Sequence, residues 1–264
     1  MKLTSYPIGI FDSGVGGTSI WKEIKALLPH ENTIYLSDSK NAPYGEKSEQ
    51  KIIDLSIKNS EFLLQQNCKL IIVACNTATT NAIKVLREKY NNPFIGIEPA
   101  IKPAALKTKT NNIGILATKG TLNSELFEKT ASTIAEEITT RETVGKGLVE
   151  LIENGKIDSS EMKKLLSSYI KPMLEDQVDC LVLGCTHYPY LIPQIREIVG
   201  EKVQIIDSGE AVAKQTKAIL EKHQLLNIDT KKGTHQFYIN KNKNVLEMLI
   251  SKNNESIKID EKDF

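Results

Sequence analysis

The sequence predicts an α/β protein with two pseudo-symmetric domains, each a mostly parallel sheet flanked by helices. Short apolar runs alternate with longer amphipathic runs along the 264 residues, which is the pattern of βαβ units. Two strand-and-loop segments also recur: GIFDSG at Gly9 resembles GILATKG at Gly114, and the strand that ends at Cys75 resembles the strand that ends at Cys185. The recurrence favours two related halves, although any α/β protein repeats strand, loop and helix.

The individual elements follow from local patterns. Apolar runs bounded by turn residues predict strands over residues 7–11, 33–36, 70–74, 94–97, 113–116, 181–183, 203–206 and 236–239. Amphipathic periodicity predicts helices over residues 17–28, 48–66, 79–90, from about 122, 148–153, 161–170, 191–199, 209–220 and 245–250. In the second helix, for example, Ile52, Leu55, Phe62 and Leu63 share one face. A strand and a helix are expected to close the chain.

The halves are expected to meet near Glu98-Pro99, with a return crossing near Ile206-Asp207. The predicted first domain therefore comprises residues 1–97 and 208–264, and the second comprises residues 98–207. The return crossing would place the C-terminal helix back on the first half.

Composition excludes several classes of protein. A formal net charge of +1 lacks the basic excess that nucleic acid or a membrane surface requires. No apolar stretch is long enough to cross a membrane, and the apolar part of the N-terminus is too short for a signal peptide. Four cysteines in 264 residues are too sparse for a disulfide scaffold, so free thiols and a cytoplasmic location are expected.

Cys75 and Cys185 each follow the carboxyl end of a predicted strand, where open α/β sheets bind ligands. A helix is expected after each cysteine, and its N-terminus would lower the pKa of the thiol. The alternative is a small buried hydrophobic residue, which is less attractive for two cysteines in matching positions. Cys68 and Cys180 lack the strand-end position and are interpreted as structural.

Two thiols facing one carbon suit racemisation. The reaction removes a proton from one face of Cα and returns a proton to the other face, which one base and one acid accomplish. A thiolate and a thiol are two states of the same group, so the pair serves both directions. Polar loops that hold the substrate carboxylate would stabilise the negative charge that develops.

Three further features are candidates for the site. Asp12 and Ser13 precede the glycines of FDSGVGG, which allow close approach of a ligand; a turn or helix cap is the alternative for Asp12. The segment around Tyr44 and Gly45 is either a simple turn or a substrate lid. His187 could tune Cys185 or be structural, and Cys-x-His lacks the paired spacing of a zinc site, so no metal is expected.

These residues together resemble glutamate racemase, of the aspartate/glutamate racemase superfamily. The segments that carry the resemblance span nearly the whole chain: GIFDSGVGGTSI from Gly9, DSKNAPYGEKS from Asp38, VACNTATT from Val73 and LVLGCTHYPYL from Leu181. The resemblance implies an active site between two domains, no pyridoxal phosphate or other cofactor, and a role in supplying D-glutamate for peptidoglycan.

The resemblance also implies roles for individual residues. Cys75 would exchange the proton of D-glutamate with the help of Asp12, and Cys185 that of L-glutamate with the help of His187. The substrate contacts would be Asp12, Ser13, Tyr44, Gly45, Asn76, Thr77, Thr186 and His187.

One segment departs from the family pattern. Thr143 to Glu153 replaces the usual Cys-Pro-containing segment and the run that follows it. The family's active-site glutamate aligns most naturally to Glu153, with Glu150 as a competitor.

Other functions stay open at this level. Aspartate could replace glutamate as the substrate, since side-chain length is decided by pocket contacts. A binding module without catalysis would need neither cysteine, and a cysteine hydrolase using Cys185 and His187 would leave Cys75 without a role. The oligomeric state is also open, with a homodimer as one option.

Overall fold

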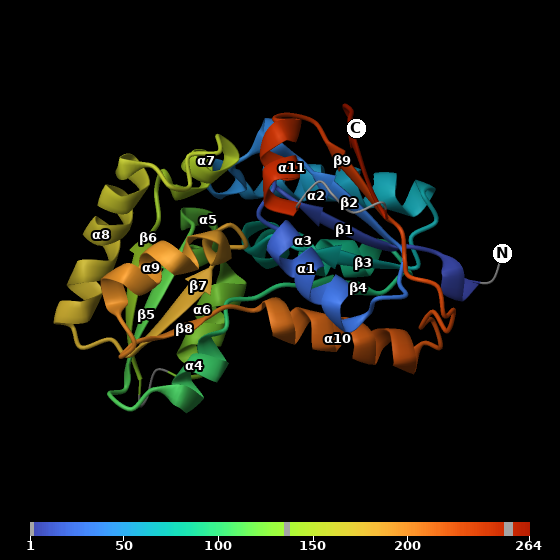
Figure 1. Cartoon of the computed structure of the whole chain (residues 1–264). Coiled ribbons are helices and arrows are strands. Elements are labelled where there is room, and N and C mark those ends of the chain that lie inside the picture. Colours follow the sequence, from blue (N-terminus) through green and yellow to red (C-terminus); the bar gives the residue numbers. More distant parts are fainter. Residues whose placement is uncertain (1–2, 135–137, 251–255) are drawn as a thin grey trace.

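The computed structural model describes residues 3–134, 138–250 and 256–264, and it forms two α/β lobes side by side (Figure 1). The larger sheet contains six parallel strands in the order β10-β9-β2-β1-β3-β4, and the smaller contains four parallel strands in the order β6-β5-β7-β8. The order β2-β1-β3-β4 in one lobe matches β6-β5-β7-β8 in the other. The two halves therefore share a topology, as the recurrent segments predicted.

The bounds of the strands show which parts of the chain build each lobe. The first sheet comprises β1 (Ile8–Asp12), β2 (Thr33–Ser37), β3 (Leu70–Val73), β4 (Phe94–Gly96), β9 (His235–Ile239) and β10 (Ile257–Glu261). The second comprises β5 (Asn112–Ala117), β6 (Thr139–Val144), β7 (Cys180–Gly184) and β8 (Gln204–Ile206). The central strands β1, β3 and β7 are buried along their whole length, as parallel strands covered on both faces require.

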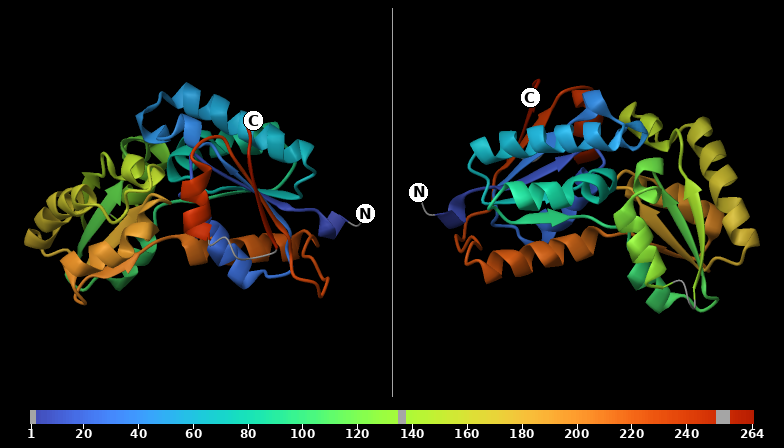
Figure 2. Two further views of the ribbon diagram at one scale, coloured as in Figure 1. Left: turned by 45° about the horizontal axis from the view of Figure 1, so that its top comes forward. Right: turned by 180° about the vertical axis from the view of Figure 1, so that it is seen from behind.

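Helices cover both faces of each sheet (Figure 2). In the first lobe, α1 (Thr18–Leu27), α10 (Gly209–Lys222) and α11 (Lys243–Ile250) contribute to one apolar core, and α2 (Glu49–Gln65) and α3 (Asn76–Lys89) to another. In the second lobe, α7 (Leu148–Glu153), α8 (Ser160–Glu175) and α9 (Ile192–Val199) lie opposite α4 (Ile101–Lys107), α5 (Lys119–Leu122) and α6 (Glu125–Ser132). Helix α10 packs against α1, so the chain returns to the first lobe after β8.

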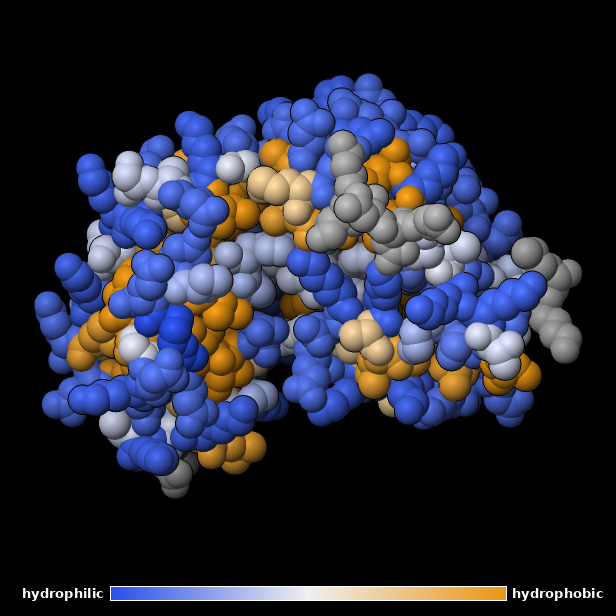
Figure 3. All heavy atoms as spheres, in the orientation of Figure 1, coloured by the Kyte–Doolittle hydropathy of each residue, from blue (hydrophilic) through white to orange (hydrophobic). Residues whose placement is uncertain are grey.

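The apolar core beneath α1 continues into the second lobe, beneath α8 and α9. Val15 in the loop before α1 belongs to the same cluster as Tyr188 and Leu191, which follow β7. The two lobes are therefore held together by shared apolar packing. On the face drawn in Figure 3, hydrophilic side chains predominate and apolar ones appear in patches on both lobes. No helix of the described residues is long and apolar enough to cross a membrane.

Three elements differ from the expectation. Strand β6 has the sequence TTRETV with no buried residue, so this edge strand carries no apolar run that would reveal it. Strand β10 follows α11, so the prediction that a helix closes the chain was wrong; its residues are likewise exposed or half-buried at a sheet edge. Helix α4 was not predicted; it contains Pro103 as its third residue, and proline is tolerated in the first turn of a helix.

Candidate active site

Cys75 and Cys185 face one small cavity between the two lobes. Its volume is about 10 Å³, which leaves room for one water molecule. The cavity is lined by Ser13, Pro43, Tyr44, Gly45, Cys75, Asn76, Thr77, Thr118, Val149, Cys185, Thr186 and His187. All predicted site residues except Asp12 and Glu153 therefore meet at this cavity, and those two lie directly behind it.

The two thiols have different surroundings. Cys75 caps α3: its Sγ accepts a hydrogen bond from the Ala78 N–H at 3.5 Å, and its S–H donates to the Ser13 Oγ at 3.6 Å. Burial raises the pKa of the Cys75 thiol well above its ordinary value, and the nearby Asp12 carboxylate raises it further. The Ala78 N–H at the helix N-terminus does lower this pKa, as expected, but desolvation outweighs it, so the expectation of a pKa below the ordinary value was wrong.

Cys185 has no α-helix directly after it, contrary to the expectation. The chain continues through Thr186 and His187 into a 3₁₀ turn at Tyr188–Leu191 before α9 begins. The Nδ1 of His187 lies 3.7 Å from the Cys185 Sγ. An imidazole side chain, rather than a helix terminus, is therefore the partner of this thiol.

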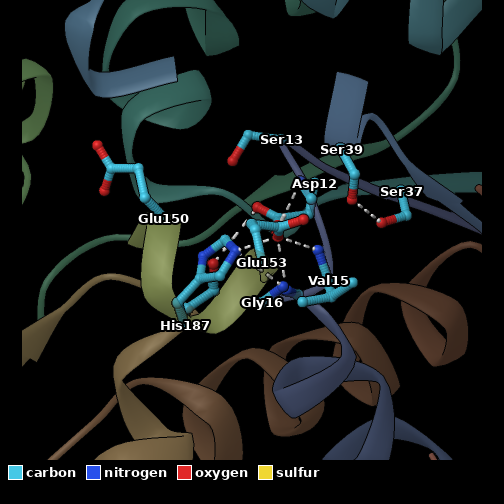
Figure 4. A network of polar contacts seen from close by, with 12 residues as sticks. Asp12, Ser13, Val15, Gly16, Ser37, Ser39, Glu150, Glu153 and His187 are labelled. Atoms are coloured by element: carbon cyan, nitrogen blue, oxygen red, sulfur yellow. Dashed lines mark hydrogen bonds and ion pairs between the residues drawn. The ribbon is translucent and has the colours of Figure 1, made fainter. Parts of the chain in front are cut away.

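His187 forms a buried ion pair with Glu153 (Figure 4). The Nε2 of His187 is 2.6 Å from the Glu153 Oε1, and the Val15 N–H donates to the same oxygen at 2.6 Å. Burial lowers the pKa of His187, but hydrogen bonds to Cys185 and Glu153 outweigh it and hold the pKa well above its ordinary value. Burial also opposes the charge on Glu153, yet His187 brings the pKa of that carboxyl below its ordinary value.

The Nε2–H of His187 donates to the Glu153 carboxylate. The Gly16 N–H also lies 3.2 Å from Nε2, but a protonated ring nitrogen has no lone pair to accept it. With both ring nitrogens protonated, Nδ1–H of His187 points its hydrogen at the sulfur of Cys185.

The glycines of the first loop make this pairing sterically feasible. A Cβ on Gly14 would lie 2.0 Å from the Glu153 Oε1, and a Cβ on Gly16 would lie 2.2 Å from the His187 Nδ1. The loop was predicted to approach a ligand closely, but at these two positions it approaches the Glu153–His187 pair instead. Any side chain there would separate the lobes or displace the ring.

Asp12 is fully buried behind the cavity. Its Oδ2 accepts the N–H groups of Gly14 at 3.2 Å and Gly17 at 2.9 Å, and its Oδ1 accepts the Thr186 hydroxyl at 3.3 Å. Burial raises the pKa of this carboxyl, although the positive charge of His187 and the two N–H donors oppose the shift. Asp12 thus supports the loop and reaches across to the second lobe.

The structure distinguishes the two candidate glutamates. Glu153, at the end of α7, contacts His187, whereas Glu150 points away from the network (Figure 4). Glu150 instead lines a neighbouring cavity of about 280 Å³, which shares Pro43, Gly45, Thr118 and Val149 with the first.

Sequence reasoning missed Pro43, Thr118 and Val149. Thr118 follows β5 as Ser13 follows β1, so the recurrent segments carried a usable signal for it. Val149 belongs to an apolar stretch of α7, and nothing in that pattern separates a cavity wall from a core position.

Cys68 and Cys180 are buried and outside this cavity. Burial raises the pKa of the Cys68 thiol to about 12 and that of Cys180 to about 11. Neither thiol lines the cavity, which agrees with the interpretation of both as structural.

The fold and the cavity define a class: two parallel α/β lobes that present a pair of cysteines to one small site. Comparison with known proteins specifies the family. The model for the Asp/Glu/Hydantoin racemase family matches residues 15–216, and the chain belongs to this family.

Individual relatives agree with that assignment. Glutamate racemase from Cupriavidus pinatubonensis is 47% identical over 219 residues, which cover 83% of this chain and 80% of that protein. The crystal structure of glutamate racemase from Francisella tularensis in complex with D-glutamate has a TM-score of 0.83 at 29% identity, with 97% of each chain covered. Glutamate racemase from Escherichia coli, in complex with L-glutamate and the activator UDP-MurNAc-ala, has a TM-score of 0.84 at 31% identity, again with 97% of each chain covered.

The glycine loop generates a direct test. We expect Gly16→Ala to displace the His187 ring from Glu153 and so to lower the pKa of His187, because burial without a counter-charge favours the neutral ring. Nuclear magnetic resonance titration of the histidine rings measures this pKa. Gly200→Ala is the control, because Gly200 has φ +62° and a Cβ there would have no heavy atom within 4 Å, so it strains the backbone away from the site. An unchanged His187 titration in Gly16→Ala would contradict the steric argument.

Proposed function

We propose that this chain interconverts L- and D-glutamate by proton transfer between Cα and two thiols, without a cofactor. One observation carries the proposal: Cys75 and Cys185 enter the same cavity from equivalent strand ends of two lobes. Similarity to glutamate racemases over most of the chain supports glutamate as the substrate. The product D-glutamate would serve peptidoglycan synthesis in the cytoplasm, a compartment that suits four free cysteines.

In the direction from L- to D-glutamate, the Cys185 thiolate takes the proton from Cα. The His187 imidazolium, whose Nδ1 is 3.7 Å from this sulfur, stabilises the thiolate before the transfer. The Cys75 thiol then gives its proton to the opposite face of Cα. One conversion leaves Cys185 as thiol and Cys75 as thiolate, and either proton exchange with solvent or the reverse reaction restores the first state.

The unequal surroundings of the thiols set the resting state. Cys75 is buried beside the Asp12 carboxylate, which opposes a second negative charge, whereas Cys185 has a cation beside it. We therefore assign the proton to Cys75 and the thiolate to Cys185. This state is ready to act on L-glutamate.

Asn76 is the strongest candidate for holding the substrate. It lines the cavity and is buried, yet neither its Nδ2 nor its Oδ1 has a hydrogen-bond partner among the described residues. A buried amide without partners carries a desolvation cost of about 1–3 kcal/mol. The carboxylate and ammonium groups of an amino acid would satisfy both atoms.

Substrate entry requires the cavity to expand, since about 10 Å³ cannot hold an amino acid. The neighbouring cavity of about 280 Å³ shares four residues with it and is the natural entrance. Gly45 and Thr118 form one side of this entrance, where a Cβ on Gly45 would lie 2.8 Å from the Thr118 Cβ. We propose that the Tyr44 loop acts as a lid that separates from the second lobe here.

Cys185, His187 and Glu153 also form an arrangement like that of a cysteine hydrolase triad. A hydrolase of this kind gives no role to Cys75. Isotope exchange distinguishes the two functions, because hydrolysis forms an acyl-enzyme and leaves Cα unexchanged.

Incubation of the protein with L-glutamate in D₂O, without cofactor, is expected to abolish optical activity and place deuterium at Cα. Cys75→Ala and Cys185→Ala should each reduce turnover by about 10³-fold or more, because either one removes an acid/base group. Circular dichroism and NMR of the Cα proton follow the reaction, and Cys68→Ala is the matched control. Deuterium exchange into aspartate but not into glutamate would identify aspartate as the substrate. Exchange into neither amino acid would refute the proposed racemase activity.

The ion pair predicts a pH dependence. His187 has a raised pKa because of Cys185 and Glu153, so its charge is present at neutral pH and is lost only as the pH rises through that raised value. We expect Glu153→Gln to lower the pKa of His187, to move the alkaline limb of kcat/KM to lower pH, and to reduce kcat/KM at pH 8 by about 10²-fold. Glu150→Gln, on the same helix, should keep the wild-type profile. Identical profiles for both variants would contradict the assignment.

A further inference from the structure

We propose that Asn240 and Asn242, in the loop between β9 and α11, are positioning residues that fix the two sides of the catalytic cavity relative to each other. Asn240 holds the Tyr44 loop of the first lobe, and Asn242 holds the end of α7 in the second lobe. The inference rests on the proposed racemase function for its catalytic consequence. Its geometric part rests on the contacts of these two side chains alone.

Asn240 uses both ends of its amide on the segment that leads to Tyr44. Its Nδ2 donates to the Asp38 Oδ1 at 2.6 Å, and its Oδ1 accepts from the Lys40 N–H at 2.8 Å. Only an amide supplies a donor and an acceptor in this arrangement; an aspartate would face the Asp38 carboxylate with a second negative charge.

Asp38 links Asn240 to the cavity wall. Its Oδ2 accepts the Tyr44 hydroxyl at 2.5 Å, and that hydroxyl in turn accepts from the Asn59 Nδ2 at 3.1 Å. Tyr44 is only 1% exposed and lines the cavity. Asn240 therefore orients a substrate-facing residue through one intermediate side chain.

Asn242 acts on the other lobe. Its backbone has φ +62°, a left-handed conformation that asparagine tolerates better than most residues. From there its Nδ2 donates to the Glu153 carbonyl oxygen at 3.0 Å. Glu153 is the last residue of α7, and carbonyls in the last turn of a helix have no partner within it. The Asn242 side chain provides that partner.

Glu153 connects this contact to the chemistry. Its carboxylate holds the His187 ring, and the ring lies beside the sulfur of Cys185. Helix α11 begins at Lys243, directly after Asn242, and Figure 1 shows it on the side of the first lobe that faces α7. The hydrogen bond from Asn242 therefore ties the first lobe to the helix end that carries the Glu153 carboxylate.

Through the two asparagines, one short loop positions residues on both sides of the cavity. Asn242 acts on the Cys185 side through Glu153 and His187, whereas Asn240 acts on the lid through Asp38 and Tyr44. Neither side chain lines the cavity, so both act through other residues.

The test uses the full-length enzyme and four forms: wild type, Asn242→Gly, Asn240→Ala and the control Asn244→Ala. Glycine retains the left-handed backbone at residue 242 while removing the amide. Asn244 is an exposed residue of α11. Steady-state kinetics are measured with L- and D-glutamate, each with hydrogen or deuterium at Cα, and the His187 ring is titrated by NMR.

For Asn242→Gly we expect kcat/KM to fall by about tenfold to a hundredfold. The primary isotope effect should rise with L-glutamate and fall with D-glutamate, because only the step that uses Cys185 becomes slower. The NMR titration of His187, which faces Glu153, Cys185 and Asp12, should move to lower pH. Asn240→Ala should raise KM for both enantiomers with kcat nearly unchanged, and Asn244→Ala should match the wild type.

Asn242→Gly with wild-type isotope effects and a wild-type His187 titration would overturn the proposal. The same holds if the variant only lowers the midpoint of urea unfolding. A wild-type protein that fails to racemise glutamate would refute the proposed function instead, and the His187 titration would still decide whether Asn242 positions the ion pair.

Discussion

The buried ion pair of Glu153 and His187 is the interaction on which the site depends. Both side chains belong to the second lobe but pack against the glycine loop of the first lobe. There the Val15 N–H donates to Glu153, and Gly14 and Gly16, which lack a Cβ, leave room for both side chains. The N–H of Val15 partly offsets the cost of burying the Glu153 carboxylate. The glycine loop therefore joins the lobes and sets the charge beside Cys185 at the same time.

The contacts of Glu153 and His187 explain how a pseudo-symmetric fold produces an asymmetric site. The strand orders of the two lobes correspond, and each lobe places a cysteine after an equivalent strand. The residues after the cysteines differ: Cys75 caps a long helix and lies near Asp12, whereas Cys185 has the His187 ring as its partner. Desolvation raises the pKa of the Cys75 thiol, whereas the His187 ring lies beside the Cys185 sulfur. Two chemically identical groups therefore lie in different electrostatic surroundings, as the proposed roles in proton transfer require.

Much of the architecture could be predicted from the sequence, because the buried strands and strand-end loops carry strong local patterns. Cys75 and Cys185 follow such strand ends, and the structure brings both to one cavity. The edge strands β6 and β10 could not be predicted, since neither buries an apolar run. The choice between Glu150 and Glu153 depends on how a six-residue helix is rotated against the other lobe. The contacts of the loop between β9 and α11 join residues far apart in sequence, which no local pattern records.

The central claim is that the resting enzyme holds one thiolate, on Cys185, and one thiol, on Cys75. The most direct measurement is the ultraviolet absorbance of thiolate at neutral pH in the wild type, Cys75→Ala, Cys185→Ala and His187→Gln. We expect one thiolate in the wild type, retained in Cys75→Ala and lost in both Cys185→Ala and His187→Gln. A thiolate that persists without Cys185 and disappears without Cys75 would contradict the claim.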